Sequence, residues 1–283
     1  AEGERWVAMR LMETPRQALI QSFTRTKAAN YAAFREVLGL HANSSNNTLF
    51  ADGEGNIAYF HANFIPRRDP RFDWSKPVDG SDPATDWGAP IALDSSPLVH
   101  NPPNGWLYNT NNWPYSAAGP GHSPRRADFP AYTDLGLENP RGVHAMALLA
   151  GRKDFTLDGL VTAAYDSHLP AFDDLVPALL EAYDHTPAGD SLRRVLAEPV
   201  AALRGWDRRW SAASVPTTLA VYWGDALWTR ARQADLEDQS LYDYMARRTS
   251  RALRLEALAE AVDQLTRDFG TWRTPWGEVN RFQ

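Results

Sequence analysis

The sequence of 283 residues contains no cysteine. This absence excludes a thiol nucleophile, a disulfide framework and every zinc site that depends on cysteine ligands. It leaves the compartment open, because proteins without disulfides occur in the cytosol, in the periplasm and outside the cell. Positive charge is also limited: the formal net charge is −6 and the sequence pI is near 5.7, which disfavours a nucleic-acid partner.

Long hydrophobic runs and familiar catalytic motifs are missing as well. No apolar run approaches the ~18–20 residues that a membrane-spanning helix needs. The seven histidines form no His-x-x-x-His or Glu-x-x-His pair, so a histidine-based metal site is unsupported. There is no Gly-x-Ser-x-Gly elbow, Walker loop or dinucleotide fingerprint. By motif alone, the chain offers no nucleophile that can be defended.

Aromatic residues, in contrast, are plentiful, with 11 Trp, 10 Tyr and 11 Phe. Several tryptophans lie beside Pro, Gly or Asp in loop-like sequence, among them Trp74, Trp87 and Trp276. Such tryptophans either fasten long loops to the body of a domain or wall an apolar ligand pocket. Five aspartates between residues 73 and 94 form either a solvated acidic loop or oxygen ligands for calcium.

Hydrophobic periodicity and turn chemistry predict an α+β fold. Strands are expected at residues 5–12, 48–51, 57–60 and 106–108, and the turn at 52–56 joins the middle two into a hairpin. Residues 65–104 are expected to form a long loop. Helices are expected at 15–38, 142–151, 156–166, 171–184, 190–204, 217–233 and 250–269, with N-caps at Asp154 or Thr156 and at Asp190. The chain thus divides into a sheet-containing part, residues 1–115, and a mostly helical part, residues 116–283.

Residues 105–114 read GWLYNTNNWP, with three asparagines in four positions. A run of asparagine usually marks a turn in which the side chain binds the nearby backbone. At a strand end, a side-chain amide can also donate to the oxyanion of an acyl-transfer intermediate, which is worth roughly 3–4 kcal/mol when well placed. The stretch by itself leaves both interpretations open.

Five segments, in order along the chain, resemble the penicillin acylase family. NNTLFADGEGNIAYFHANFIPRR resembles the family's hairpin and the Pro-x-Arg that follows it. PVDGSDPATDWGAPI is similar to a family loop through Gly80, Trp87 and Gly88. GWLYNTNNWP resembles an Asn-x-Asn segment of the family. LENPRGVHAMALLAGRKDFTLDGL resembles a family segment in which an arginine is followed by a helix. TPWGEVNRFQ resembles a later Trp-Gly-Glu segment.

The resemblance implies an N-terminal-nucleophile hydrolase with an αββα sandwich. In that family a precursor cuts itself and exposes a serine whose α-amino group acts as the base. By position, Asn111 would donate to the oxyanion, and Asn112 would do so if the register is off by one. Arg141 would orient that asparagine and the substrate. No cofactor is required, although Pro66 and an acidic partner, Asp128 or Asp134, would hold a structural calcium.

The chain also departs from the family's pattern. Residue 1 is alanine, which cannot attack a carbonyl, and the internal serines Ser22, Ser44 and Ser45 have no free amine. We therefore expect an internal part of the β subunit, inactive alone, whose partners are the α subunit and the remaining β-subunit segments.

The expected reaction is hydrolysis of the amide between an acyl chain and an amine nucleus: a β-lactam, a homoserine lactone or a lipopeptide. The aromatic loops of residues 65–140 would wall the acyl pocket. The expected location is the periplasm or the medium. The alternatives are a non-catalytic, Trp-rich ligand-binding module and a glycosidase that uses an Asp/Glu pair.

Overall fold

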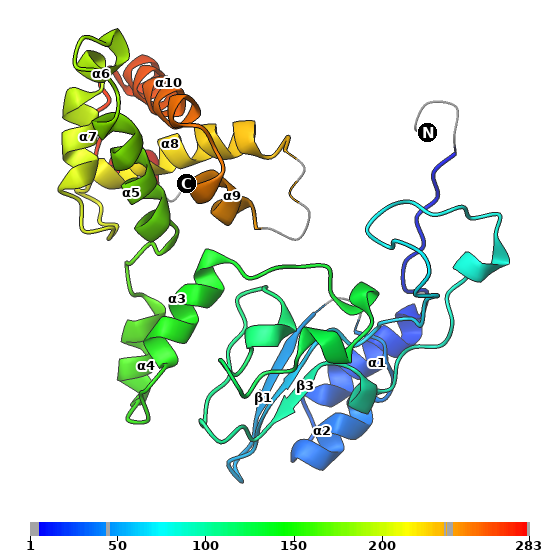
Figure 1. Ribbon diagram of the computed structural model, residues 1–283. Helices are drawn as coiled ribbons and strands as arrows, with labels where there is room; N and C mark the ends of the chain where they lie inside the picture. Colours follow the sequence, from blue (N-terminus) through cyan, green and yellow to red (C-terminus); the bar gives the residue numbers. More distant parts are fainter. Residues whose placement is uncertain (1–5, 44–45, 235, 237–239, 282–283) are drawn as a thin grey trace. The chain divides into compact units, whose positions relative to one another are not determined.

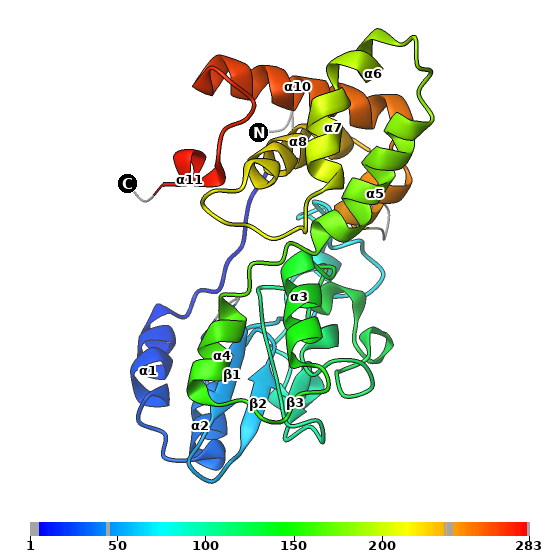
Figure 2. The same cartoon turned by 90° about the vertical axis from the view of Figure 1, so that its left-hand side faces the viewer.

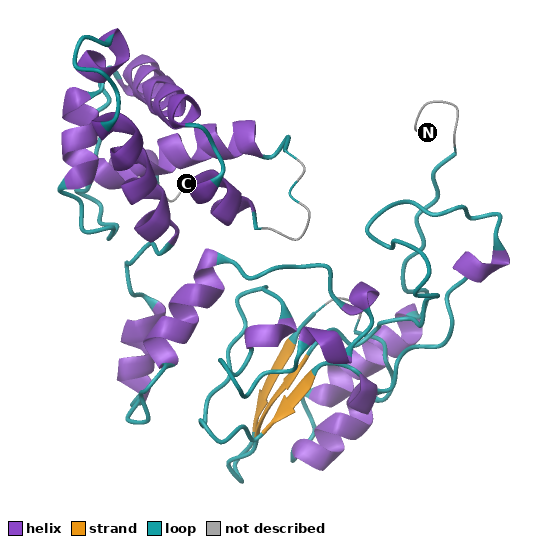
Figure 3. Cartoon of the chain, in the orientation of Figure 1, coloured by secondary structure: helices purple, strands orange, loops and turns teal. Residues whose placement is uncertain are grey.

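The computed structural model describes residues 6–43, 46–234, 236 and 240–281. The chain forms two compact units, which are described separately: unit 1 is Ala1–Glu138 with Ala145–Lys153, and unit 2 is Asn139–His144 with Asp154–Gln283. Figure 3 shows a small sheet in the first unit and helices in the second, and the architecture is α+β as expected. No helix among the described residues is long and apolar enough to cross a bilayer.

Unit 1 contains a three-stranded antiparallel sheet in the order β1 (Thr48–Ala51), β2 (Ile57–Phe60), β3 (Leu98–His100). The predicted hairpin is confirmed, because the Asp52 carboxylate accepts from the backbone N–H of Glu54 and Asn56 at 3.0 and 2.9 Å and so closes the turn. The strand expected at 106–108 is wrong. The third strand comes instead from the segment expected to be a loop, because residues 98–100 pair with β2.

The two faces of this sheet are covered by different parts of the chain. Helix α2 (Tyr31–Leu38) packs Phe34 and Leu38 against Ala58 and Phe60. Side chains of a strand alternate between faces, so Tyr59 and Val99 point to the other side. There they pack against Ala117 and Ala118, just after the asparagine-rich stretch. The sheet thereby supports the segment that carries the candidate oxyanion donor.

The expected helix at 15–38 is two helices, α1 (Pro15–Arg25) and α2. The break occurs because the Asn30 side chain accepts from the backbone N–H of Ala33 at 3.0 Å and starts a new helix. The strand expected at 5–12 is also wrong: residues 6–12 have no regular structure, and Trp6 is 96% exposed. No neighbouring strand pairs with them among the described residues.

The long segments of unit 1 contain only short 3₁₀ turns besides β3. These turns are η1 (Pro83–Thr85), η2 (Leu93–Ser95), η3 (Pro114–Ser116), η4 (Arg126–Asp128) and η5 (Ala131–Thr133). Trp74 and Trp87 fasten the segment 65–104 locally. The Trp74 indole donates to the backbone carbonyl of Asp69 at 2.7 Å, and Trp87 packs on Phe64.

Unit 2 is helical, and α3 (Pro140–Leu149) contributes its residues up to His144 to unit 2 and those from Ala145 to unit 1. The remaining helices are α4 (Leu157–Ala164), α5 (Ala171–Asp184), α6 (Ser191–Val195), α7 (Ala197–Arg204), α8 (Val215–Ala231), α9 (Leu241–Arg247), α10 (Arg251–Phe269) and α11 (Trp276–Val279). Helix α10 lies against α8 in both views (Figures 1 and 2). The fully buried Trp223 of α8 donates to the backbone carbonyl of Arg254 at 3.1 Å.

Most of the expected helices of unit 2 are confirmed. Thr156 and Asp190 are N-caps, whereas Asp154 is not. The helix expected at 190–204 is divided at Leu196 into α6 and α7, and α9 and α11 were not expected. All strands of the described residues precede residue 115. The assignment of residues 1–115 and 116–283 to parts of a β subunit stays a prediction.

Candidate functional site

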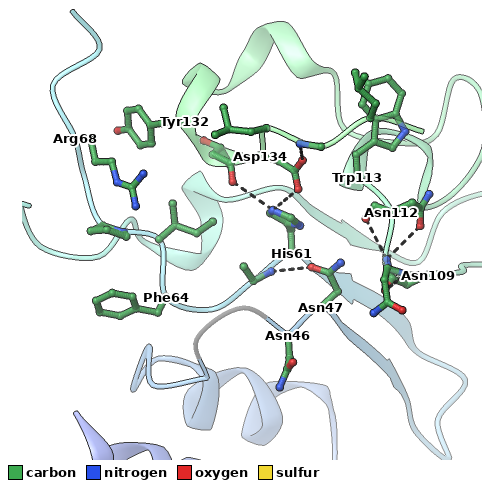
Figure 4. A pocket seen from close by; sticks show the side chains of 18 of the residues that line it. Asn46, Asn47, His61, Phe64, Arg68, Asn109, Asn112, Trp113, Tyr132 and Asp134 are labelled. Atoms are coloured by element: carbon green, nitrogen blue, oxygen red, sulfur yellow. Dashed lines mark hydrogen bonds and ion pairs between the residues drawn. The ribbon is translucent and has the colours of Figure 1, made fainter. Parts of the chain in front are cut away.

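A pocket of about 730 Å³ opens in unit 1 beside the end of β2 (Figure 4). Three stretches form most of its wall: residues 61–68 after β2, the asparagine-rich stretch, and residues 132–137. Asn46, Asn47 and Arg25 complete it. The aromatic side chains in the lining are Phe64, Trp113 and Tyr132, and they lie among amide and charged groups. The pocket can therefore accept a ligand that has both an apolar part and hydrogen-bonding groups.

Asn112 lines the pocket but is buried, with 6% of its surface exposed. The two N–H donors of its amide are shared among the Tyr108 hydroxyl, the Ser116 hydroxyl and the Glu138 carboxylate, which lie 3.0, 3.1 and 2.9 Å from the amide nitrogen. Its carbonyl oxygen accepts from the backbone N–H of Thr110 at 3.1 Å. Since both ends of the side-chain amide are engaged inside the protein, Asn112 has no donor left for a ligand.

Glu138 is the acceptor at the centre of this network. Besides Asn112, the indole of Trp113 donates to it at 3.1 Å, and the hydroxyls of Tyr108 and Ser116 donate to it as well. Burial raises the pKa of Tyr108 to about 12, which keeps its hydroxyl protonated as a donor. The network joins the asparagine-rich stretch to the segment just before α3.

Asn111 differs from Asn112 in its burial, its backbone conformation and its hydrogen bonds. Its backbone is left-handed, with φ of 58°, and its N–H donates to the side-chain carbonyl of Asn109 at 3.3 Å. The residue is exposed and lines the pocket. Within the described part of the chain, its side-chain amide makes no hydrogen bond, so it can donate to a ligand. Asn109 and Asn112 therefore form the turn, and Asn111 leaves its amide free at the pocket, while its donation to an oxyanion stays a prediction.

A second buried network, around His61, also lines the pocket (Figure 4). The Nδ1 of His61 lies 3.2 Å from the Tyr59 hydroxyl, and its Nε2 lies 3.2 Å from the Asp134 carboxylate. Burial lowers the pKa of His61 and outweighs the opposing effect of Asp134, so the ring is neutral at pH 7. A single tautomer satisfies both contacts: Nε2–H donates to Asp134, and Nδ1 accepts from Tyr59.

Arg68 brings positive charge to the pocket. Its guanidinium lies over the rings of Trp74 and Trp87, at 5.2 and 5.1 Å from their centres. These two tryptophans hold Arg68 and do not themselves line the pocket. Burial lowers the pKa of Arg68, and no carboxylate within the described residues pairs with it.

The residues expected to bind calcium are separated by the structure. Pro66 lines the pocket, whereas Asp128 is not in the lining and instead binds Arg125 at 2.7 Å. Of the two acidic partners considered, Asp134 shares the pocket with Pro66. No group of three acidic or histidine side chains suited to a metal occurs among the described residues. Calcium binding stays a prediction.

The role expected for Arg141 also stays a prediction, because Arg141 belongs to unit 2 and Asn111 to unit 1. Arg141 is exposed at the start of α3, and its charge lowers the pKa of Tyr242, opposing the larger effect of burial. Of the internal serines, Ser22 lies in α1 and does not line the pocket, while Ser44 and Ser45 lie outside the described residues.

The sequence did not single out Tyr108, Ser116 and Glu138, which surround Asn112. The one signal was the position of Glu138, three residues before Arg141 in a segment singled out for its resemblance. It missed His61 as well, because a lone histidine after a strand carries no motif.

A sequence model of the penicillin amidase family matches residues 2–283. The chain belongs to the penicillin amidase family. Among curated relatives, penicillin G acylase of Escherichia coli is 37% identical over 68 residues, which are 24% of this chain and 8% of that protein. Among solved structures, the thermostable penicillin G acylase from Alcaligenes faecalis matches with a TM-score of 0.60 at 19% identity.

The match to the Alcaligenes faecalis structure covers 90% of this chain and 52% of that one. The chain therefore spans about half the length of this penicillin amidase relative. At this identity the structural match shows the fold.

Proposed function

We propose that this chain is part of the β subunit of an acylase that hydrolyses the amide between an acyl side chain and an amine nucleus. A β-lactam, a homoserine lactone or a lipopeptide would supply that nucleus. The nucleophile is the N-terminal serine of the mature β subunit, contributed by a segment outside these 283 residues. Family membership supports the reaction class, and the αββα sandwich of the complete enzyme is part of the same proposal.

The observation that carries the proposal is the contrast between the two neighbouring asparagines. Asn112 has its amide engaged inside the protein, while Asn111 presents an unengaged amide at the pocket. A neutral donor that is held before the reaction begins can stabilise the negative charge that develops on the carbonyl oxygen. Asn111 is therefore the oxyanion donor of the proposed mechanism, as the sequence register also favours.

In this mechanism the serine hydroxyl attacks the substrate carbonyl while its own α-amino group takes the proton. Asn111 donates to the resulting oxyanion, and the α-ammonium group returns the proton to the nitrogen of the amine as the C–N bond breaks. Water, deprotonated by the same α-amino group, then attacks the acyl-enzyme and releases the acid and the serine hydroxyl. Phe64, Trp113 and Tyr132 supply apolar contacts for the acyl chain, and Arg68 supplies positive charge. We further propose that Arg141 helps to orient Asn111, that Pro66 with Asp134 or Asp128 holds a structural calcium, and that the enzyme acts in the periplasm or the medium.

The test uses the full-length protein and a chromogenic acyl amide. Asn111→Gly removes the donor but keeps a left-handed backbone unstrained, so it should lower kcat by about 10²–10³-fold with little change in KM. Asn111→Asp keeps the size of the side chain but removes its N–H donors, so it should also lower kcat. Glu54→Gln, an exposed change in the hairpin turn, is the control and should keep wild-type activity. Wild-type turnover in Asn111→Gly would refute the proposed role.

The same variants separate the alternatives. In a ligand-binding module, no turnover occurs and Asn111→Gly leaves affinity almost unchanged. A glycosidase requires two carboxylates, which lie ~5–5.5 Å apart in retaining enzymes. Among the described residues that line the pocket, Asp134 is the one carboxylate, so the pocket offers no such pair.

A further inference from the structure

The Asn111 donor sits on a turn that has few contacts of its own. Asn111 is exposed, and among the described residues its hydrogen bond is the one from its backbone N–H to the Asn109 side-chain carbonyl. What fixes the turn is the next residue, because the Asn112 carbonyl oxygen accepts from both the backbone N–H and the hydroxyl of Thr110, at 3.1 and 3.2 Å. The direction of the Asn111 side chain therefore depends on how firmly Asn112 is held.

Asn112 is held in turn by a residue 26 positions away. Its amide nitrogen donates to Oε1 of Glu138 at 2.9 Å, while the Trp113 indole donates to Oε2 at 3.1 Å. Both groups are donors only, and they approach different oxygens of the carboxylate. A carboxylate accepts at both oxygens and therefore suits this position, whereas an amide of the same size has only one acceptor.

We propose that Glu138 is the positioning residue of the oxyanion donor: its carboxylate fixes Asn112 and Trp113, and through them holds Asn111 toward the substrate carbonyl. Glu138 does not line the pocket. Its effect is transmitted through the turn 109–112. This inference rests on the role proposed for Asn111, and it extends the functional unit to a residue just before α3.

The first test measures the turn itself and does not depend on catalysis. In the full-length protein, the Glu138→Gln amide nitrogen must face either the Asn112 amide or the Trp113 indole. Since both are donors, one of the two hydrogen bonds is lost. We expect hydrogen exchange in a peptide covering residues 106–113 to speed up by at least tenfold. Exchange in the β1–β2 hairpin should remain as in the wild type, which shows that the unit is folded. Glu54→Gln is the matched control, since it makes the same chemical change at an exposed glutamate.

The second test asks whether Glu138 acts through Asn111. Glu138→Gln should lower kcat for the chromogenic amide by about 10–100-fold with little change in KM, because small misplacements of a catalytic group have effects of this size. In an Asn111→Gly background, Glu138→Gln should cause almost no further loss. Residues that act as one unit are non-additive in this way.

Each outcome has one meaning. Unchanged exchange at residues 106–113 in Glu138→Gln refutes the inference, whatever the activity. If the two substitutions multiply in the double variant, Glu138 acts independently of Asn111, which also refutes it. If the wild-type protein hydrolyses no acyl amide, the proposed function fails, and the exchange experiment still decides whether Glu138 fixes the turn.

Discussion

Replacing Asn63 by alanine should destabilise unit 1 more than any exposed asparagine change. Asn63 is 6% exposed and lies within the stretch 61–68 after β2, between the pocket-lining residues Ala62 and Phe64. Its carbonyl oxygen accepts from the Gln21 side chain at 2.8 Å and from the backbone N–H of Asn43 at 3.0 Å. Its amide nitrogen donates to the backbone carbonyl of Leu38 at 2.9 Å. One side chain thus connects α1, the end of α2 and the exit from β2.

The expected loss of stability follows from the polar groups that lose their hydrogen-bond partner. Asn63→Ala removes the partner of three groups, of which Gln21 is only 1% exposed. A buried group without its partner costs ~1–3 kcal/mol, and water entering the vacated space offsets part of the total. We expect a loss of about 3–5 kcal/mol in the free energy of unfolding of unit 1.

Native-state hydrogen exchange with peptide resolution is the suitable assay, because a chain with two units has no single unfolding midpoint. Exchange in α1, α2 and β2 should speed up by about 150- to 5,000-fold, while the helices of unit 2 stay unchanged. Asn46→Ala is the control, since Asn46 is exposed and makes one bond to Asn43. A change below tenfold in α1 and β2 would show that the Asn63 contacts do not hold these elements together.

Two further predictions concern pH and the core of unit 2. Burial lowers the pKa of His61, so below its ordinary value of 6.5 the unfolded chain binds a proton that the folded chain does not. Unit 1 should therefore have its full stability above that pH and lose stability as the pH falls through the lowered pKa of His61. Hydrogen exchange in β2, corrected for the intrinsic exchange rates, should show this pH dependence in the wild type. The dependence should be absent in His61→Gln. Trp223→Ala should cost about 3–5 kcal/mol in unit 2, since Trp223 is fully buried; a change under 1 kcal/mol in the exchange of α8 and α10 would contradict it.

The sequence predicted well what is decided locally. The hairpin strands 48–51 and 57–60 were correct to the residue because Asp52 and Gly55 build the turn from within. The N-caps Thr156 and Asp190 were correct for the same reason. The third strand was wrong because pairing with β2, and not the aromatic composition of residues 106–108, decides which segment becomes a strand.

In the candidate site, too, the sequence predicted the local features and not the long-range contacts. The sequence located the asparagine-rich stretch and gave the register that favours Asn111. It could not separate Asn111 from Asn112 on physical grounds, because the difference between them is made by Glu138, 26 residues from Asn112. A contact at that separation leaves no local pattern. The same holds for the Tyr59–His61–Asp134 network, whose members come from β2, the residue after it and the segment after η5.

The left-handed backbone at residue 111 restricts which amino acids evolution or an engineer can place there. Glycine adopts this conformation without strain but has no side-chain donor. Glutamine, lysine and arginine carry donors, yet most residues with a Cβ pay roughly 1–2 kcal/mol in this region. Asparagine tolerates it and carries an amide. Libraries built on the proposed donor role should therefore keep asparagine at 111 and vary the neighbouring lining, because the left-handed backbone and the need for a side-chain donor select the same residue.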